Sequence, residues 1–387
     1  MKKIYWVVIV AAIILLTGGL FYYFYYFQKS NTQNNQNASQ KNNTDQFNVI
    51  IVGWDGVQRD QFFKCYNQEL PECSNGLANI KELSSDKVYN LTVTNSATST
   101  KPGWVQILSG YNGEITGTIT NEDYATIPEG YTIFEKASAK YADLKTIFLA
   151  AKTDNLGSTC VGEKKSDGEV ELKGEPWCIL KSKISYFKNG LGKNEAVGDK
   201  TLEMISQYQN DRFLLFAQFI EPDASGHAYG SNSTEYSESI IDNDNWLGKI
   251  NARLKELNLY QNTIIYVASD HGFDQNSKSH KNAPFTIYAT NDTKVIRSGD
   301  RRDIAATILK RYEVGLAKND SAPKVDGTPL DITPNECVNL GQSYLDYKGA
   351  PKCCQNLTLT NLDLVSADGT IIPATGGTGD NSGYCEK

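Results

Sequence analysis

Three apolar segments of this chain each end in acidic or histidine residues, and this repeated design limits the folds open to it. They are FNVIIVGWDG (47–56), DRFLLFAQFIEPD (211–223) and QNTIIYVASDHG (261–272). A continuous apolar run is typical of a strand covered on both faces in a parallel sheet. Helix-like stretches over 195–209 and 235–259 come before the second and third segments. Strands that alternate with helices predict a doubly wound α/β fold with a mainly parallel sheet.

Polar side chains follow these predicted strands at the points where they stop. They are Asp55, Asp223, Asp270 and His271. In open α/β sheets ligands bind beyond the carboxyl ends of the strands, so we expect the four to converge. A single aspartate after a strand is often only a helix cap or a turn residue. Three strands that end in the same way favour a shared site instead.

All three histidines of the chain lie in short sequences that are typical of metal sites. His227 follows Asp223 by four residues in EPDASGHAYG, His271 follows Asp270 directly, and His280 comes nine residues later. Histidine and aspartate are common ligands of borderline-soft divalent ions such as zinc. The pattern therefore predicts a metal site rather than three scattered core histidines.

The segment TNSATSTKPGWVQILSGY (94–111) can supply a reactive hydroxyl group. Pro102 is suited to the first turn of a helix, which we expect to run to about Ser109 and to stop at Gly110. An anionic substrate is favoured at such a helix start. Three hydroxyl residues precede the proline: Thr98, Ser99 and Thr100. Any of them can also serve merely as the helix cap.

The order of these motifs resembles that of the alkaline phosphatase superfamily, most closely its type I phosphodiesterase and nucleotide pyrophosphatase branch. The resemblance covers roughly 47–331. It begins with a strand ending in WDG and with T-x-P, which opens a helix that ends in SG. It continues with EPDASGHAYG, SDHGF, the later His280 and the closing RRDIAATILKRYEVG and VDGTPLD. It implies an alkaline phosphatase-like catalytic domain over 47–331.

The resemblance also implies roles for individual residues. One zinc ion would be held by Asp223, His227 and His280, and a second by Asp55, Asp270 and His271, with other divalent metals as alternatives. Thr100 would bridge toward the second ion as the nucleophile and form a phosphoryl-enzyme intermediate. Asn121 would donate to a nonbridging phosphate oxygen, although by itself it is equally compatible with an ordinary turn. The implied substrate is a small phosphodiester or nucleotide-like molecule with a phosphodiester or pyrophosphate bond.

Two residues depart from the family pattern. Lys101 stands where nucleotide-cleaving members usually have an aromatic residue, and Gly103 stands where they have asparagine. A lysine beside the nucleophile would suit a phosphomonoester, but adjacent residues on an extended approach usually point apart, so we expect diesters to be preferred. The alternatives are a phosphomonoesterase, a phosphoethanolamine-type transferase, or an inactive surface binding protein. Sulfatases need a cysteine or serine that becomes formylglycine, which Thr100 cannot supply.

Charge and cysteine content restrict the partners and the compartment. The formal net charge of −7 and the absence of a Lys/Arg cluster argue against binding to nucleic acid polymers. Eight cysteines fit an oxidising compartment. We expect local disulfides between Cys65 and Cys73 and between Cys160 and Cys178. The other four cysteines lie in 332–387, a predicted extension with a few β-strands and no assigned activity.

The first residues predict a membrane anchor, over 1–27. Residues 4–27 contain no charged side chain and are long enough to cross a bilayer as a helix. Lys2 and Lys3 precede the run and favour a cytoplasmic amino terminus, with the catalytic domain on the far side. A cleaved signal peptide is the competing interpretation. The Asn/Gln-rich segment 28–46 predicts a disordered linker. The oligomeric state is left open by the sequence.

Overall fold

The computed structural model describes residues 47–93, 97–164, 170–318 and 322–332, together with five short strands nearer the carboxyl terminus. The predicted membrane helix and linker, 1–46, lie outside these residues. Among the helices that are described, none is both long and apolar enough for a membrane span.

The body is built on an eight-stranded sheet with the order β10-β2-β9-β8-β1-β7-β3-β6. Its central strand β1 (Asn48–Asp55) pairs in parallel with β7 (Phe213–Pro222) and β8 (Thr263–Ser269). The remaining strands are β2 (Val88–Thr92), β3 (Lys145–Ala150), β6 (Tyr186–Lys188), β9 (Phe285–Thr290) and β10 (Gly299–Asp300). Only β9 runs antiparallel to its neighbours in this sheet, so the prediction of a mainly parallel sheet is confirmed.

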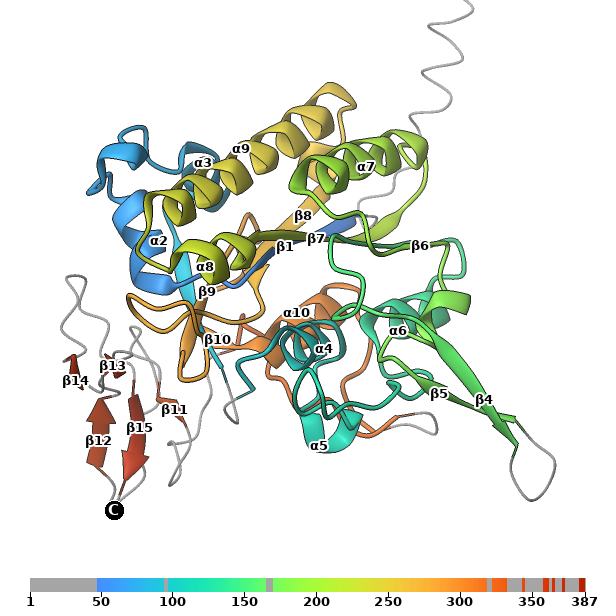
Figure 1. Cartoon of the computed structure of the whole chain (residues 1–387). Helices are drawn as coiled ribbons and strands as arrows, with labels where there is room; N and C mark the ends of the chain where they lie inside the picture. The colour runs from blue at the N-terminus through green and yellow to red at the C-terminus, as the bar shows by residue number, and fades with distance from the viewer. Residues whose placement is uncertain are drawn as a thin grey trace, which may run out of the picture. The chain divides into compact units, whose positions relative to one another are not determined.

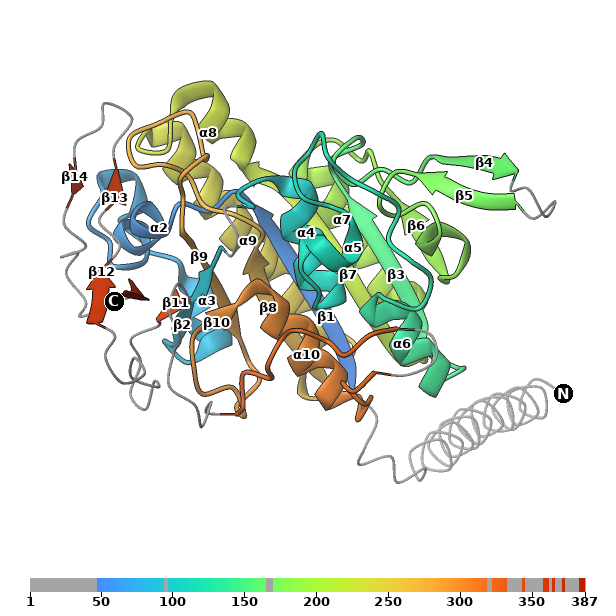
Figure 2. The same ribbon diagram turned by 90° about the horizontal axis from the view of Figure 1, so that it is seen from below.

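Helices cover both faces of the sheet (Figure 1). One layer contains α2 (Arg59–Tyr66), α3 (Ala78–Ser84), α7 (Asn194–Gln207), α8 (Asp223–Tyr229) and α9 (Thr234–Glu256). The other contains α4 (Thr100–Ser109), α5 (Gly113–Thr116), α6 (Ile133–Lys140) and α10 (Arg301–Arg311), which Figure 2 shows in front of the sheet. Single 3-10 turns span Pro71–Cys73, Leu180–Ser182 and Tyr260–Asn262.

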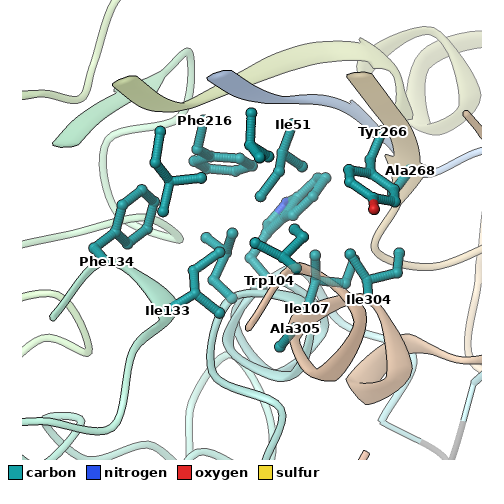
Figure 3. Close-up of a cluster of buried hydrophobic side chains, with 14 of the residues drawn as sticks. Ile51, Trp104, Ile107, Ile133, Phe134, Phe216, Tyr266, Ala268, Ile304 and Ala305 are labelled. Carbon is teal, nitrogen blue, oxygen red and sulfur yellow. The ribbon is translucent and has the colours of Figure 1, made fainter. Parts of the chain in front are cut away.

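The core is divided by the sheet, because successive strand residues point to opposite faces. In β1, Val49 and Ile51 pack with the layer of α4, α6 and α10, while Ile50 and Val52 pack with the other layer. The buried indole of Trp104 anchors α4 to the sheet, with its ring centroid 5.0 Å from that of Phe216 (Figure 3). This contact fixes the start of α4 against the sheet.

The strongly patterned segments form the elements that the sequence predicts. The helices expected over 195–209 and 235–259 are α7 and α9. The helix expected after Pro102 ends at Ser109, and Gly110 follows in the left-handed region with φ of 79°. A left-handed residue is the usual stop of a helix, and glycine adopts it without steric cost.

The two expected local disulfides are confirmed, Cys65–Cys73 and Cys160–Cys178. The second closes a segment that contains the hairpin of β4 (Cys160–Lys164) and β5 (Val170–Gly174). In the predicted extension the structure describes β11 (Ser343–Tyr344), β12 (Thr358–Asn361), β13 (Leu364–Val365), β14 (Ile371–Ile372) and β15 (Gly383–Glu386). The few short strands expected there are therefore present.

Candidate active site

Strand ends and one helix start bring the predicted site residues to the carboxyl edge of the sheet. Asp55 is the last residue of β1, Asp223 follows β7 directly, and Asp270 follows β8 directly. The parallel register places these ends side by side, since Gly53 lies between Gln218 and Ala268. Thr100 is the first residue of α4. The four predicted strand-end side chains therefore lie close together.

A first group of candidate metal ligands consists of Asp223, His227 and His280, whose ligand atoms lie within 4.8 Å of one another. Asp223 and His227 lie one turn apart on α8, which places both side chains on one face. The ring of His280 comes from the loop after β8 and lies 5.0 Å from that of His227, measured between centroids. In the same loop, the backbone carbonyl oxygen of Lys278 lies 2.9 Å from Nδ1 of His227.

The second group consists of Asp55, Asp223 and His271, again with ligand atoms within 4.8 Å. Asp223 is thus common to both groups. The family resemblance implies Asp270 in this group; the geometric group has Asp223 in its place, while Oδ2 of Asp270 lies 3.5 Å from Nε2 of His271. Nδ1 of His271 lies 2.9 Å from the carbonyl oxygen of Gly272, which leaves Nε2 turned toward the carboxylates.

Several buried polar atoms of these groups are left without a hydrogen-bond partner among the described residues. They are Oδ1 of Asp223, Oδ2 of Asp270 and Nδ1 of His280. An unsatisfied buried polar atom is costly, and it calls for an explanation such as a bound ion. Carboxylate oxygens and imidazole nitrogens are ligands that zinc accepts. The donor set therefore fits metal ions.

The structure distinguishes the three candidate hydroxyl groups. Oγ1 of Thr100 lies 3.4 Å from Nε2 of His271 and is nearly inaccessible to solvent. Oγ1 of Thr98 instead donates to the carbonyl oxygen of Lys281. Ser99 is the N-cap of α4, but its side chain makes no capping hydrogen bond within the described part of the chain. Thr100 is therefore the hydroxyl that faces the ligand groups.

Lys152 is a site residue that the sequence analysis missed. Its ammonium group lies 2.8 Å from Oδ1 of Asp55, 2.6 Å from Oδ2 of Asp223 and 3.1 Å from Oγ1 of Thr100. It follows the apolar run of β3, at Lys145–Ala150, by two residues. A polar residue after an apolar strand is the same signal that indicated Asp55, and it would have indicated Lys152.

The buried carboxylates alter the protonation of His271. Burial by itself would lower the pKa of His271, but Asp270 and Asp55 outweigh it and raise the pKa to about 9. Burial also raises the pKa of Asp270 to about 7, and the negative charge of Asp55 adds to the effect. His271 and Asp270 are therefore both proton-binding groups near neutral pH, and a metal ion must displace the proton of His271.

His280 behaves in the opposite way. Burial and repulsion from the neighbouring His271 lower the pKa of His280 to about 3. Its imidazole is neutral at physiological pH, which is the form that binds metals. Burial would raise the pKa of Asp223, but the Lys152 ammonium outweighs it and holds the pKa well below its usual range.

Asn121 lies beside the helix start that carries Thr100. Its Oδ1 atom accepts a hydrogen bond of 2.9 Å from the backbone N–H of Lys101. The Lys101 ammonium donates to the backbone carbonyl of Asn121 at 2.8 Å and lies 3.8 Å from the ring centroid of Tyr124. Because Oδ1 of Asn121 already accepts a hydrogen bond, the NH₂ group of its side chain is the part that can donate one. The Lys101 ammonium is held by this loop.

Gly103 allows α4 to approach the Asp270 loop closely. A Cβ atom added at Gly103 would lie 2.7 Å from both the Cβ atom and the carbonyl oxygen of Asp270. Real Cβ atoms do not approach backbone so closely. The departure from the family pattern at this position therefore has a steric reason in this chain.

The fold and the site together define a class: a doubly wound α/β protein with two candidate metal-ligand groups and a threonine at a helix start. Among known families, the model of type I phosphodiesterase / nucleotide pyrophosphatase matches residues 49–330. The chain belongs to this family.

Curated relatives are similar over part of their length. The bis(5'-adenosyl)-triphosphatase ENPP4 of Homo sapiens is 27% identical over 237 residues, which cover 59% of this chain and 48% of the relative. The chain thus spans about half the length of that relative. Ectonucleotide pyrophosphatase/phosphodiesterase family member 1 of Homo sapiens is 29% identical over 186 residues, 46% of this chain and 19% of the relative. Among solved structures, the alkaline phosphatase of the Antarctic bacterium TAB5 is 15% identical with a TM-score of 0.47, covering 70% of this chain and 99% of that chain.

Gly103→Ala is expected to damage the site by forcing α4 and the Asp270 loop apart. Overpacking of this kind typically costs about 1–3 kcal/mol of stability. We expect a lower melting temperature and weaker metal uptake, measured by thermal unfolding and by metal analysis after dialysis. Gly315→Ala is the matched control, because nothing lies within 4 Å of a Cβ added there. Equal behaviour of the two variants would contradict the steric argument.

Metal affinity is expected to fall as the pH is lowered, because metal-free His271 is protonated below its pKa of about 9. Displacing the His271 proton alone reduces the apparent affinity up to tenfold per pH unit, or about thirtyfold between pH 8 and pH 6.5, and the raised pKa of Asp270, about 7, steepens the fall further at the lower end. Competition with a zinc-chelating dye, corrected for the dye's own titration, measures this change. An affinity that is constant over this range would show that His271 is already neutral.

Proposed function

We propose that this protein is a metal-dependent hydrolase that cleaves phosphodiester or pyrophosphate bonds of small, nucleotide-like molecules. The observation that carries the proposal is the position of Thr100, whose Oγ1 atom lies 3.4 Å from Nε2 of His271, a member of the second ligand group. Membership of the type I phosphodiesterase / nucleotide pyrophosphatase family supports the same reaction class.

Two zinc ions are the proposed cofactors. Asp223, His227 and His280 would hold one, and Asp55, Asp270 and His271 would hold the other. When bound, such ions lower the pKa of a facing hydroxyl and neutralise charge on phosphate oxygens. The mixed nitrogen and oxygen donor set favours zinc over magnesium or calcium, which prefer oxygen ligands alone.

The proposed reaction has two displacement steps at phosphorus. In the first, Oγ1 of Thr100 loses its proton to solvent and attacks, so that a Thr100 Oγ1–P bond forms while the bond from phosphorus to the leaving oxygen breaks. The leaving oxygen takes up a proton from solvent. In the second, water attacks the phosphoryl-threonine, the Oγ1–P bond breaks and Thr100 regains its proton. A covalent intermediate of this kind divides one difficult displacement into two easier ones.

Asn121 is the proposed donor to a nonbridging phosphate oxygen, through the NH₂ group that its contact with Lys101 leaves for donation. A neutral amide suits the single negative charge of a diester. The Lys101 ammonium is engaged by the carbonyl of Asn121 and the Tyr124 ring, so it is poorly placed to meet the second charge of a monoester. We therefore propose a preference for diesters.

The proposed location is a membrane surface, with residues 4–27 as a single span and the catalytic domain on the extracytoplasmic side. The uncharged run at 4–27 supports the span. The two disulfides of the body support an oxidising compartment. Fractionation of cells that express the full chain, followed by protease treatment of intact cells, tests both parts.

Thr100→Ala is expected to abolish turnover while metal content stays close to that of the wild type, because the carboxylate and imidazole ligands remain. Removal of an activated nucleophile typically costs several orders of magnitude in rate. Ser99→Ala is the matched control, since it removes the adjacent hydroxyl that makes no capping bond in the described structure. Substantial activity in Thr100→Ala would show that the covalent route is wrong.

The substrate preference is tested with bis-p-nitrophenyl phosphate and p-nitrophenyl phosphate, followed by a nucleoside triphosphate. We expect the diester to have the higher kcat/KM, and Asn121→Ala to reduce diester cleavage. Replacement of one positioned donor typically reduces the rate by about 10²–10³-fold. A wild-type preference for the monoester of tenfold or more would identify the protein as a phosphatase.

A further inference from the structure

The Lys152 ammonium group lies inside the candidate site and uses all its hydrogen-bonding capacity there. An ammonium group has three N–H donors and no acceptor. Its three partners are Oδ1 of Asp55, Oδ2 of Asp223 and Oγ1 of Thr100. The side chain of Lys152 is only 12% exposed. A cation is therefore held in place against the proposed nucleophile.

The backbone that carries Lys152 is fixed to the same carboxylate. Oε1 of Gln218 accepts hydrogen bonds from the backbone N–H groups of Ala151 and Lys152, at 3.0 and 3.2 Å. Nε2 of the same amide donates to Oδ2 of Asp55 at 2.7 Å. Gln218 is fully buried in β7, the strand beside β3. The Gln218 side chain thus connects the Lys152 backbone with Asp55, so the pairing of β3 with β7 fixes the position of the lysine.

The contacts of Lys152 leave oxygen atoms free for metal ions. Asp223 gives Oδ2 to the ammonium, while its Oδ1 faces Nε2 of His227 at 3.4 Å and lacks a hydrogen-bond partner among the described residues. The unpartnered Oδ2 of Asp270 faces Nε2 of His271 at 3.5 Å. The lysine therefore leaves one oxygen each of Asp223 and Asp270 for a metal ion. Both oxygens of Asp55 already accept, Oδ1 from Lys152 and Oδ2 from Gln218, so Asp55 would bind a metal ion only by sharing or giving up one of these hydrogen bonds.

The ammonium also determines the orientation of the Thr100 hydroxyl group. Because it can only donate, Oγ1 of Thr100 must accept at their 3.1 Å contact. The hydroxyl proton of Thr100 must then point away from Lys152. A fixed positive charge beside this oxygen stabilises the negative charge that develops there, and such an effect is strong at a buried site.

We propose that Lys152 is a catalytic residue that orients Thr100 and stabilises negative charge on its Oγ1 atom. The proposal rests on the function proposed above. In the first step the charge develops as Thr100 loses its proton and the Oγ1–P bond forms. In the second it returns as that bond breaks, before Thr100 takes up a proton. Lys152 keeps its own proton throughout, so it acts by position and charge rather than as an acid or base.

The test compares Lys152→Met and Lys152→Arg with the wild-type full chain and with Lys145→Met. Lys145 lies at the start of β3, the strand that Lys152 follows, and its ammonium is 4.0 Å from Asp211. Four measurements are made: bound metal per chain, the melting temperature of metal-free protein, the kinetics of bis-p-nitrophenyl phosphate cleavage (kcat and KM), and the fraction of Thr100 phosphorylated after rapid quenching.

We expect Lys152→Met to bind metal like the wild type, to keep KM within about threefold and to lose at least about 10²-fold in kcat. Its phosphorylated fraction should form correspondingly slowly in the first turnover. Lys152→Arg retains a cationic donor, so its kcat should lie between those of the Met variant and the wild type. Lys145→Met should match the wild type in all four measurements.

Three results would overturn the proposal. Metal bound at least tenfold more tightly by Lys152→Met, with kcat retained, would mean that the lysine only fills a metal position. Lost metal with unchanged kcat per bound metal would mean a purely structural role. If Lys152→Met does not fold, an Arg variant with intact metal binding but a kcat reduced as far as that of Thr100→Ala would contradict a role of charge. An inactive wild type would instead refute the proposed function.

Discussion

The parallel pairing of β1 with β7 and β8 is the constraint on which the site depends. Its register brings Asp55, Asp223 and Asp270 to one edge. Asp55 and Asp270 are 215 positions apart in the sequence (270 − 55). The strands are apolar on both faces and each face packs against its own layer of helices, so a shift of register by one residue would exchange the side chains that fit the two layers. The hydrophobic core therefore holds three carboxylates together, in spite of their mutual repulsion.

This repulsion must be offset by positive charge in the site. Within the described structure, Lys152 offsets part of the negative charge, and the raised pKa values of His271 and Asp270 show that the cluster still favours protons. Groups that bind protons for this reason also favour metal ions. The unpartnered atoms of Asp223, Asp270 and His280 lead to the same conclusion independently of any titration. Burial and charge thus both favour cations at this edge.

The residues that depart from the family pattern have local physical reasons. Gly103 lies where α4 meets the Asp270 backbone, and no larger residue fits there without movement. Lys101 reaches back to the carbonyl of Asn121, so the charge next to the nucleophile serves to hold a loop. The cation that touches Thr100 is Lys152, which lies just after β3 and not in α4. Adjacency in sequence and proximity in space therefore identify different lysines, and only the second can act on the reacting oxygen.

The sequence by itself determined the fold class, the central strands, α4 with its stop at Gly110, the helices α7 and α9, and the set of polar residues at the strand ends. These features follow from local periodicity and from residues that favour one backbone conformation. It did not reveal the antiparallel β9 or the membership of Asp223 in both ligand groups. The residues alone left Thr98, Ser99 and Thr100 open as candidate hydroxyls, and only the family resemblance pointed to Thr100, which lies 3.4 Å from His271. Prediction from the sequence also missed Lys152, although its place after an apolar strand is a usable signal; the contact of Lys152 with Thr100 depends on distances between elements far apart in the chain. Those distances are decided only when the sheet is assembled, by pairing and packing between segments far apart in the chain.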